Sequence, residues 1–402
     1  MNKDKEKNQI AKKIFYIYLF SLCFGIFTID VGFSIKPYMF ATILIYIYLM
    51  LTKQKFTFNF GKIDLIYILF MIFCSLELLF VEHSDNSFRY ILGMIIMYIS
   101  YFGVTNLCKK ISKRTVENTI CNVGLVFSII TIIYYLVGLK SLNFNFIGNG
   151  VISYGVLLDR SVARLISFAS SDPNITAFIF TLFFFFNLKN IKSIKNKISV
   201  FLISSIIILT FSRGAILAFS LSFLYFILYE KNISSTIKRA IKIVVPLIIV
   251  LFILNIISDG LVFDIFIKRF SESLNDGGSG RMNLWDESFK IFNNHPILGI
   301  GLNNSRYYIS GTYIHNTFLQ VLAETGIVGF AFYIIYILLI YLESKKIDVF
   351  NKNNFFRSIT ICFLFQMFLL SILLQESFFT YLALLKVTYD YTYKKENTEN
   401  EN

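Results

Sequence analysis

Long apolar runs recur along this chain and constrain its fold more than any other feature. Of its 402 residues, 56% are hydrophobic and only 16% are charged, whereas soluble domains carry about 25% charged residues. Many of the runs approach the ~20 residues that an α-helix needs to cross a membrane. The sequence therefore predicts an all-α polytopic integral membrane protein.

The apolar runs divide into about twelve predicted membrane-spanning helices. They cover residues 14–35, 37–52, 63–81, 88–107, 119–139, 173–188, 198–212, 214–229, 240–257, 325–342, 356–373 and 377–393. The runs at 198–212 and 214–229 are short for a hydrocarbon core of ~30 Å. A re-entrant pair around residues 212–214 is therefore an alternative to two full spans.

Positive charges predict the orientation of these helices. Most of the 38 Lys and Arg residues lie on the side that would hold both termini, in connections such as 109–114 and 189–197. Short loops rich in Lys and Arg stay in the cytoplasm. We therefore expect both termini to be cytoplasmic and two sizeable loops to face outward.

The predicted organisation follows from this orientation. The parts are membrane helices 1–5 in residues 1–139, the first outer loop at 140–172, helices 6–9 in 173–257, the outer loop with the candidate site at 258–324, helices 10–12 in 325–393, and a disordered cytoplasmic tail at 394–402.

Most of the excess positive charge sits in short connections along the chain, which argues against a nucleic acid partner although the net charge is +13.

Several chemistries find no support in the sequence. There is no GxxxxGK[ST] motif of a P-loop ATPase and no Cys/His cluster of a zinc site. No DxD pair lies in the predicted outer loops, so we expect neither a divalent metal ion nor another cofactor. Long runs of intramembrane acids, as a proton-coupled transporter would carry, are also missing.

Residues 279–329 form a polar interruption in this apolar chain and hold two of its three histidines. From His315 the sequence HNTFLQVLAETG predicts a helix with Asn316, Gln320 and Glu324 on one polar stripe. His315 would begin this helix at the mouth of the tenth span. There it can act as a general base near neutral pH, or it can make only an interfacial hydrogen bond.

The same segment carries an aromatic stripe and two glycines. Trp285, Phe289 and Phe292 fall at helical spacing, which predicts an amphipathic helix ending at the following Asn-Asn-His-Pro sequence. Its apolar face would rest on the membrane surface or on the helical bundle. Gly299 and Gly301 allow a tight turn or a close approach of two backbones.

Arginines are prominent among the few positive charges of the predicted outer side. They include Arg160, Arg164, Arg213, Arg281 and Arg306. A guanidinium group binds phosphate in a bidentate way, so an anionic head group is a natural partner. Alternatively, Arg213 anchors its tight turn at the membrane interface, and Asp172 and Asn174 near Arg164 are helix caps only.

These motifs carry a resemblance to a known family. The segments SGRMNLWDESFKIFNNHPILGIG and HNTFLQVLAETGIVGF resemble the signature of the O-antigen polymerase/ligase superfamily, which comprises bacterial polytopic membrane glycosyltransferases and includes the Wzy-type polymerases. The segments LTFSRGAILAF and SDPNITAF resemble its accessory motifs. The resemblance covers roughly residues 160–330, and its motifs do not separate a polymerase from a ligase.

The resemblance implies an enzyme of the bacterial plasma (inner) membrane. Its substrate would be an oligosaccharide on undecaprenyl diphosphate, presented at the outer leaflet among membrane lipid. His315 matches the family's histidine and would deprotonate the attacking sugar hydroxyl. Arg281 and Arg213 match motif arginines and would bind the diphosphate, so that no metal ion is needed.

The resemblance also implies a wider set of residues that bind substrate. Arg164 would be a third contact to the diphosphate and Arg160 a weaker one. Glu324 matches the family's helix glutamate and would orient His315 or bind sugar. We add Asn316 and Arg306 to this predicted set because they lie in the same polar segment.

The function that we predict is polymerisation of repeat units into a capsular or O-antigen-type surface polysaccharide, with flippase and chain-length regulator proteins as partners. The abundance of Ile, Phe, Lys, Asn and Tyr suggests an AT-rich genome and favours a capsule in a Gram-positive cell. A ligase that moves the glycan to another acceptor is the alternative within the family. A lipid-linked oligosaccharide flippase and a structural scaffold are alternatives from other classes.

Overall fold

The computed structural model describes residues 2–52, 60–144, 148–159, 162–228, 252, 267, 280–309 and 311–400. The fold is mostly α-helical, as predicted. Arg160 lies outside the described residues, as do most of the predicted ninth span at 240–257 and of the outer loop up to residue 279.

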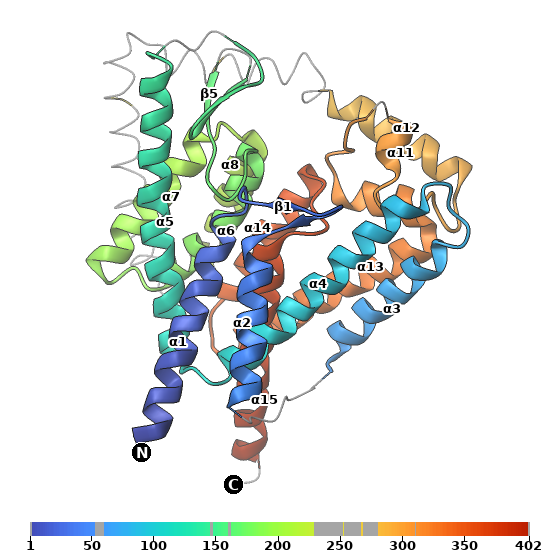
Figure 1. The fold of residues 1–402 in the computed structure, drawn as a ribbon. Helices are drawn as coiled ribbons and strands as arrows, with labels where there is room; N and C mark the ends of the chain where they lie inside the picture. Colours follow the sequence, from blue (N-terminus) through green and yellow to red (C-terminus); the bar gives the residue numbers. More distant parts are fainter. Residues whose placement is uncertain are drawn as a thin grey trace.

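The described helices form one bundle with two small sheets. The helices are α1 (Asn2–Leu22), α2 (Pro37–Leu51), α3 (Lys62–Glu77), α4 (Ser84–Cys108), α5 (Lys113–Ser141), α6 (Pro173–Lys189), α7 (Ile194–Leu209), α8 (Arg213–Leu228), α11 (Arg281–Asn294), α12 (Ser305–Tyr308), α13 (Thr317–Phe350), α14 (Phe355–Leu369) and α15 (Glu376–Asn400). The strands are β1 (Ile29–Asp30), β2 (Ser34–Ile35), β3 (Val151–Ser153), β4 (Val156–Asp159) and β5 (Val162–Leu165). Helices α1, α2, α5 and α15 stand nearly upright in Figure 1, and α3, α4 and α13 cross them obliquely.

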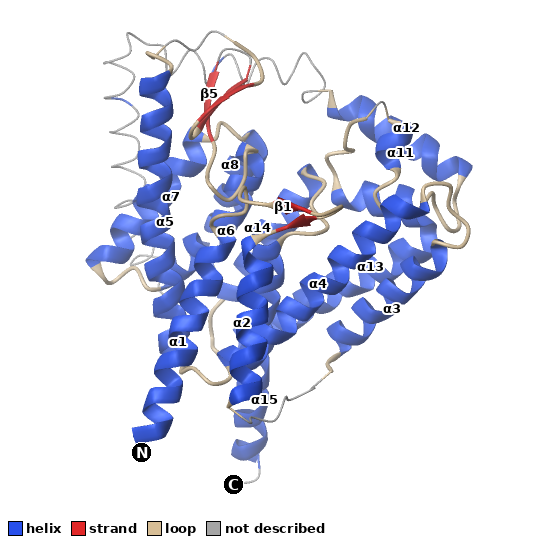
Figure 2. Cartoon of the chain, in the orientation of Figure 1, coloured by secondary structure: helices blue, strands red, loops and turns tan. Residues whose placement is uncertain are grey.

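The two ends of the molecule differ in what they carry. Both termini lie at one end, and α11, α12 and strand β5 lie at the opposite end (Figures 1 and 2). The candidate residues of α11 and of the connection into α13 therefore lie far from the termini.

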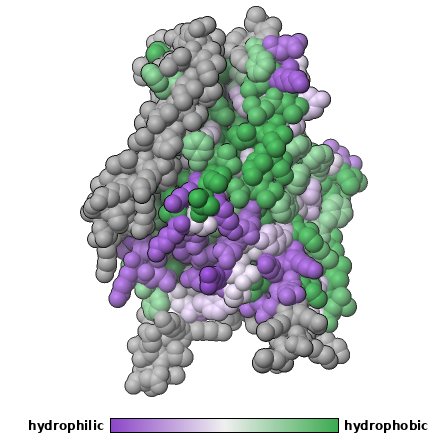
Figure 3. All heavy atoms as spheres, turned by 90° about the vertical axis from the view of Figure 1, so that its left-hand side faces the viewer, coloured by the Kyte–Doolittle hydropathy of each residue, from purple (hydrophilic) through white to green (hydrophobic). Residues whose placement is uncertain are grey.

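Apolar helices dominate the described chain. Helices α4, α5 and α13 are long and apolar enough to cross a membrane, and α2, α6, α8 and α14 are shorter apolar helices. In the view of Figure 3, hydrophobic residues cover much of the middle and upper surface, and hydrophilic residues gather towards the end with the termini. These features support the predicted membrane protein.

The first predicted span, 14–35, is wrong in its second half. Helix α1 ends at Leu22, and β1 and β2 then form a short antiparallel hairpin. The backbone N–H of Ile26 donates to the carbonyl of Phe168 (3.0 Å), and the rings of Phe27 and Phe168 stack with centroids 6.0 Å apart. Contacts with this distant segment bend the chain, although its residues are as apolar as those of a helix.

Two further segments differ from the predicted organisation. The first outer loop, 140–172, contains the three-stranded antiparallel sheet β3–β4–β5, in which Leu157 pairs with Arg164. Helix α15 continues to Asn400, through the segment that we expected to be disordered. Its last residues are rich in Lys, Glu and Thr, of which Lys and Glu are good helix formers.

Helix α13 is interrupted at Gly326, whose φ of 59° and ψ of −166° are not helical. The backbone groups freed by this break find partners in the connection that follows α11. The N–H of Gly301 donates to the carbonyl of Glu324 (2.8 Å), and the N–H of Ile327 donates to the carbonyl of Pro296 (2.9 Å). A membrane protein requires such partners because lipid cannot bind exposed backbone groups.

Two glycines permit this contact between backbones. A Cβ atom on Gly299 would lie 2.3 Å from the carbonyl oxygen of Glu324, and one on Gly326 would lie 2.3 Å from that of Ile297. Both residues also have a positive φ, which favours glycine. Of the two possibilities that the sequence allows around Gly299, a tight turn or a close approach of two backbones, the structure shows the close approach.

The contact at Gly299 can be tested against a glycine with the same backbone angle. Gly280 also has a φ of 75°, but a Cβ there would meet no atom within 4 Å. Each Gly→Ala substitution should cost ~1–2 kcal/mol for the left-handed conformation. Gly299→Ala should cost ~1–3 kcal/mol more because the added methyl group clashes with the backbone.

Thermal unfolding of the two purified variants in detergent measures this difference. Equal melting temperatures would contradict the close backbone packing around the break in α13.

Candidate active site

His315 lies in the connection between α12 and α13, and both of its neighbours in sequence are buried. The hydroxyl of Thr317 donates to the carbonyl of Leu370 (2.6 Å) and accepts from the N–H of Ile372 (3.0 Å). These contacts hold His315 at a φ of 55°, a conformation that costs a residue with a side chain ~1–2 kcal/mol. Such strained positions cluster at functional sites.

Asn316 begins α13 as its N-cap residue. Its Oδ1 accepts from the backbone N–H groups of Phe318 (3.0 Å) and Leu319 (3.1 Å), as N-cap residues do, so α13 starts two residues after the predicted start at His315. This structural role differs from the substrate contact that we predicted for Asn316, and that contact stays a prediction.

Glu324 is fully buried and organises the connection before α13. Its carboxylate accepts from the N–H of Asn303 (2.8 Å), the hydroxyl of Ser305 (2.6 Å) and the amide of Gln320 (3.2 Å). Among the described residues these partners do not include His315. Glu324 therefore fixes the 303–305 backbone on α13. The role that the resemblance implies for it, orienting His315 or binding sugar, stays a prediction.

Three arginines that are far apart in the sequence interact electrostatically in the structure. Arg281 begins α11, Arg213 begins α8, and Arg164 lies on β5. Burial, followed by the charges of Arg213 and Arg164, lowers the pKa of Arg281, whereas Asp172 acts in the opposite direction. Arg281 donates no hydrogen bond to any residue that the structure describes. Like charges held this close favour the binding of an anion.

Arg164 holds the turn that carries Arg213. It donates to the carbonyl of Thr210 (2.9 Å) and to the carboxylate of Asp159 (2.9 Å), with a longer bond to the side chain of Asn174 (3.4 Å). These protein partners give Arg164 a positioning role in addition to its charge. Its predicted contact with the diphosphate stays a prediction.

Asp172 and Asn174 link the start of α6 to the same turn. Asp172 caps the helix by accepting from the backbone N–H of Asn174 (2.6 Å), which confirms its predicted role as a cap. The side-chain oxygen of Asn174 accepts from the hydroxyl of Ser212 (2.7 Å). The SDPN and SR motifs are thus joined by hydrogen bonds beside the arginines, and the sequence alone did not predict this contact.

His315 belongs to the same electrostatic cluster. Burial, followed by the positive charge of Arg281, lowers the pKa of His315, and the charge of Asp172 partly opposes this shift. At neutral pH the imidazole is therefore neutral, which is the form that can accept a proton. The charge of Arg281 thus acts on His315, and the charges of Arg213 and Arg164 act on Arg281. That the four residues form one site, as the sequence predicts, stays a prediction.

Arg306 occupies a different place. Its guanidinium donates to the side-chain oxygen of Asn86 (2.7 Å) and lies over the ring of Tyr307, 5.3 Å from its centroid. The ring of Tyr307 in turn stacks on His83. Arg306 therefore helps to join α12 to the start of α4, and its predicted contact with substrate finds no support in these partners.

The predicted amphipathic helix is confirmed as α11, which ends at Asn294, but its aromatic stripe is only partly buried. Ser288 and Ile291 are its buried residues, and Phe289 is 47% exposed. The ring of Trp285 contacts that of Phe368 on α14, with centroids 5.6 Å apart. The helix thus rests on the bundle through a face shifted from the predicted one.

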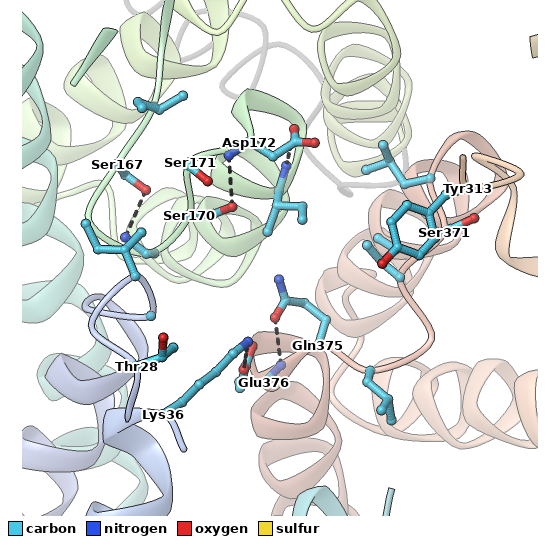
Figure 4. Close-up of a pocket in the computed structure, with 18 of the residues that line it drawn as sticks. Thr28, Lys36, Ser167, Ser170, Ser171, Asp172, Tyr313, Ser371, Gln375 and Glu376 are labelled. Atoms are coloured by element: carbon cyan, nitrogen blue, oxygen red, sulfur yellow. Dashed lines mark hydrogen bonds and ion pairs between the residues drawn. The ribbon is translucent and has the colours of Figure 1, made fainter. Parts of the chain in front are cut away.

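A cavity of about 610 Å³ opens beside His315. Asp172 and Tyr313 also line it, and Lys36 and Glu376 form an ion pair of 2.6 Å in its wall (Figure 4). Sequence reasoning missed this pair, because Lys36 precedes α2 and Glu376 begins α15, and the two lie 340 positions apart in the chain. In the described part of the chain, no group of three or more His, Cys, Asp or Glu side chains could hold a metal ion.

A comparison with protein families matches the part of the chain that carries several of these residues. A model of the O-antigen ligase family matches residues 198–334. The match contains Arg213, Arg281 and His315, and it confirms the resemblance to the O-antigen polymerase/ligase superfamily. Members of this family are membrane glycosyltransferase-like enzymes that act on lipid-linked glycans. A comparison with curated proteins gave no match.

The electrostatic link between Asp172 and His315 can be measured directly. Asn is also a good N-cap residue, so Asp172→Asn should keep the start of α6. Because the negative charge of Asp172 raises the pKa of His315, its removal should move the His315 midpoint to lower pH.

NMR titration gives this midpoint when His83 and His295 are both replaced by Gln, so that His315 is the single histidine. We expect a midpoint below the ordinary value of 6.5 and a further decrease with Asp172→Asn. A midpoint that rises or does not move would show that the two groups are not close.

Proposed function

We propose that this protein is a glycosyltransferase that polymerises undecaprenyl-diphosphate-linked repeat units into a surface polysaccharide. The observation that carries the proposal is the cluster of Arg164, Arg213, Arg281 and His315, in which burial and neighbouring charge act on both Arg281 and His315. A cluster of arginines suits a diphosphate, and a neutral histidine beside it suits a general base.

In the proposed reaction the arginines hold the diphosphate of the donor chain. His315 takes the proton from a hydroxyl of the acceptor sugar, and the oxygen of that hydroxyl forms a bond to the anomeric carbon of the donor. The bond between the anomeric carbon and the phosphate oxygen breaks, and its electron pair leaves with the lipid diphosphate. His315 then passes its proton to the released diphosphate or to water, and one-step displacement inverts the anomeric configuration.

Charge stabilisation by arginine would make a metal ion unnecessary in this reaction. The leaving diphosphate gains negative charge as the bond breaks, and guanidinium donors that are already in place stabilise that charge. Arg281 and Arg213 are the residues that we place on the diphosphate. Arg164 would support them through its charge and by fixing the turn before Arg213.

The proposed setting is the outer face of a bacterial plasma membrane. The end of the molecule with α11 and α12 would face outward, and the end with both termini would face the cytoplasm, where most Lys and Arg residues lie. About twelve spans, a capsular product and a partner flippase belong to the same proposal. A ligase that transfers the glycan to another acceptor is the second candidate, because the matching family model is that of O-antigen ligase.

His315→Gln should reduce transfer by ~10²–10⁴, the usual contribution of a general base. Arg281→Ala should reduce it by a similar ~10²–10³ because a charge-stabilising donor is lost. Arg213→Lys should also impair transfer, since lysine lacks the bidentate fork. The measurement uses purified protein in lipid vesicles with a defined undecaprenyl-diphosphate repeat unit, and products are separated on a gel.

His295→Gln is the matched control, because His295 is an exposed histidine at the end of α11. It should give the same ladder as the wild type. A normal ladder from His315→Gln would refute the catalytic role of His315. Product that appears only after a different acceptor is added would favour the ligase.

A further inference from the structure

We propose that the cavity beside His315 binds the acceptor saccharide and selects a sugar without negative charge, with the Lys36–Glu376 ion pair as a specificity element. This inference rests on the proposed function, because His315 must reach a hydroxyl of that sugar. It goes beyond that function by naming the acceptor site and the chemical class that it accepts.

The cavity suits an acceptor because His315, the proposed base, lines it and no arginine is among its described lining residues. Its volume of about 610 Å³ lies within the usual range for ligand sites, ~300–1,000 Å³. His315 and Asp172 line it, and none of its described lining residues is an arginine. His315 thus borders the cavity, and the positive charge of Arg281 lowers its pKa. The diphosphate and the acceptor would therefore occupy different places, with the base between them.

The polar groups of the wall match a saccharide. Lys36 Nζ donates to Glu376 Oε1 at 2.6 Å, and the two side chains are 35% and 10% exposed. A donor and an acceptor thus stand side by side, as the hydroxyl groups of a sugar require. The other polar side chains are mostly uncharged hydroxyls and amides, and they include Thr28, Ser170, Ser171, Ser371 and Gln375.

The balance of charge in the wall disfavours an acidic sugar. Its charged residues are Lys36, Asp172 and Glu376, so carboxylates outnumber cations while His315 is neutral. A carboxylate on the acceptor would leave water and meet this negative wall, which is costly. The positive arginines would be offset by the bound diphosphate. The cavity therefore suits a neutral hexose or an N-acetylated amino sugar better than a uronic acid.

The cavity extends away from the reacting end. Figure 4 shows Thr28 and Lys36 on one side of the pocket and Tyr313 and Ser371 on the other. Tyr313 is two residues from His315 in the sequence. An acceptor whose reacting hydroxyl is at His315 would therefore extend across the pocket towards the ion pair.

Two acceptors that differ only in charge test the inference. Both derive from the repeat unit that accumulates in cells lacking this protein, and a phosphonate link to the lipid prevents them from donating. One keeps its neutral terminal sugar, and the other has the terminal hydroxymethyl group oxidised to a carboxylate. The donor is the same unit with its acceptor hydroxyl blocked, and kcat/KM for each acceptor is measured on full-length protein in vesicles.

We expect the wild type to prefer the neutral acceptor by about tenfold or more. Glu376→Gln frees the charge of Lys36 and should reduce this preference about tenfold. Lys36→Met frees the charge of Glu376 and should increase the preference. If the ion pair were merely structural, both substitutions would lower kcat/KM for the two acceptors to the same extent. Opposite changes in the preference are therefore expected only if the pair contacts the acceptor.

Asp390→Asn is the matched control, because Asp390 also lies on α15 and pairs with Lys109 at 2.8 Å, outside the cavity. It should leave the preference unchanged. Thr28→Lys adds a positive charge at an exposed position of the cavity wall and should also reduce the preference. It keeps the test decisive if Glu376→Gln fails to fold.

The outcomes separate this inference from the proposed function. Transfer without discrimination, or equal effects of Glu376→Gln and Lys36→Met on both acceptors, would overturn the inference and leave the transferase intact. A natural repeat unit that ends in a uronic acid would overturn it as well. Absence of any transfer by the wild type would refute the proposed function and, with it, the inference.

Discussion

The backbone contact at the break in α13 is the constraint on which the candidate site depends. Where the helix stops at Gly326, the chain at Pro296–Gly301 supplies the missing backbone partners. An interruption of this kind is stable in an apolar bundle only when its polar groups are satisfied by protein. The contact ties the connection after α11 to α13, and it thereby fixes the two elements that carry Arg281 and His315.

Buried polar side chains extend this contact towards the site. The carboxylate of Glu324, two residues before the break, binds the backbone at 303–305, and Thr317 binds both Leu370 and Ile372. A buried carboxylate without such partners would be costly. The short connection with His315 is thus held between two anchored segments, and this explains how its strained backbone conformation is maintained.

The arginines of the candidate site show how charges from distant segments act together. Arg164, Arg213 and Arg281 come from three separate elements, and Asp172 is the acid that opposes the pKa shifts of both Arg281 and His315. The positive charges of Arg213 and Arg164 lower the pKa of Arg281, and an anionic ligand would offset this effect. We propose that the arginines hold the diphosphate and that the cavity beside His315, whose wall carries fewer charges, holds the acceptor.

The sequence by itself determined the helical class and the start of α6, and it proposed Arg164, Arg213, Arg281 and His315 among a larger set of candidate site residues. Apolar periodicity and cap residues act locally, so the cap at Asp172 could be assigned before the fold was known, whereas Asn316 was expected inside its helix and caps it instead. Only the tertiary structure decided that α1 ends at Leu22, that Glu324 binds the 303–305 backbone, and that Lys36 meets Glu376. These contacts join residues distant in the chain, and their free energy depends on burial and on partners that no local pattern specifies.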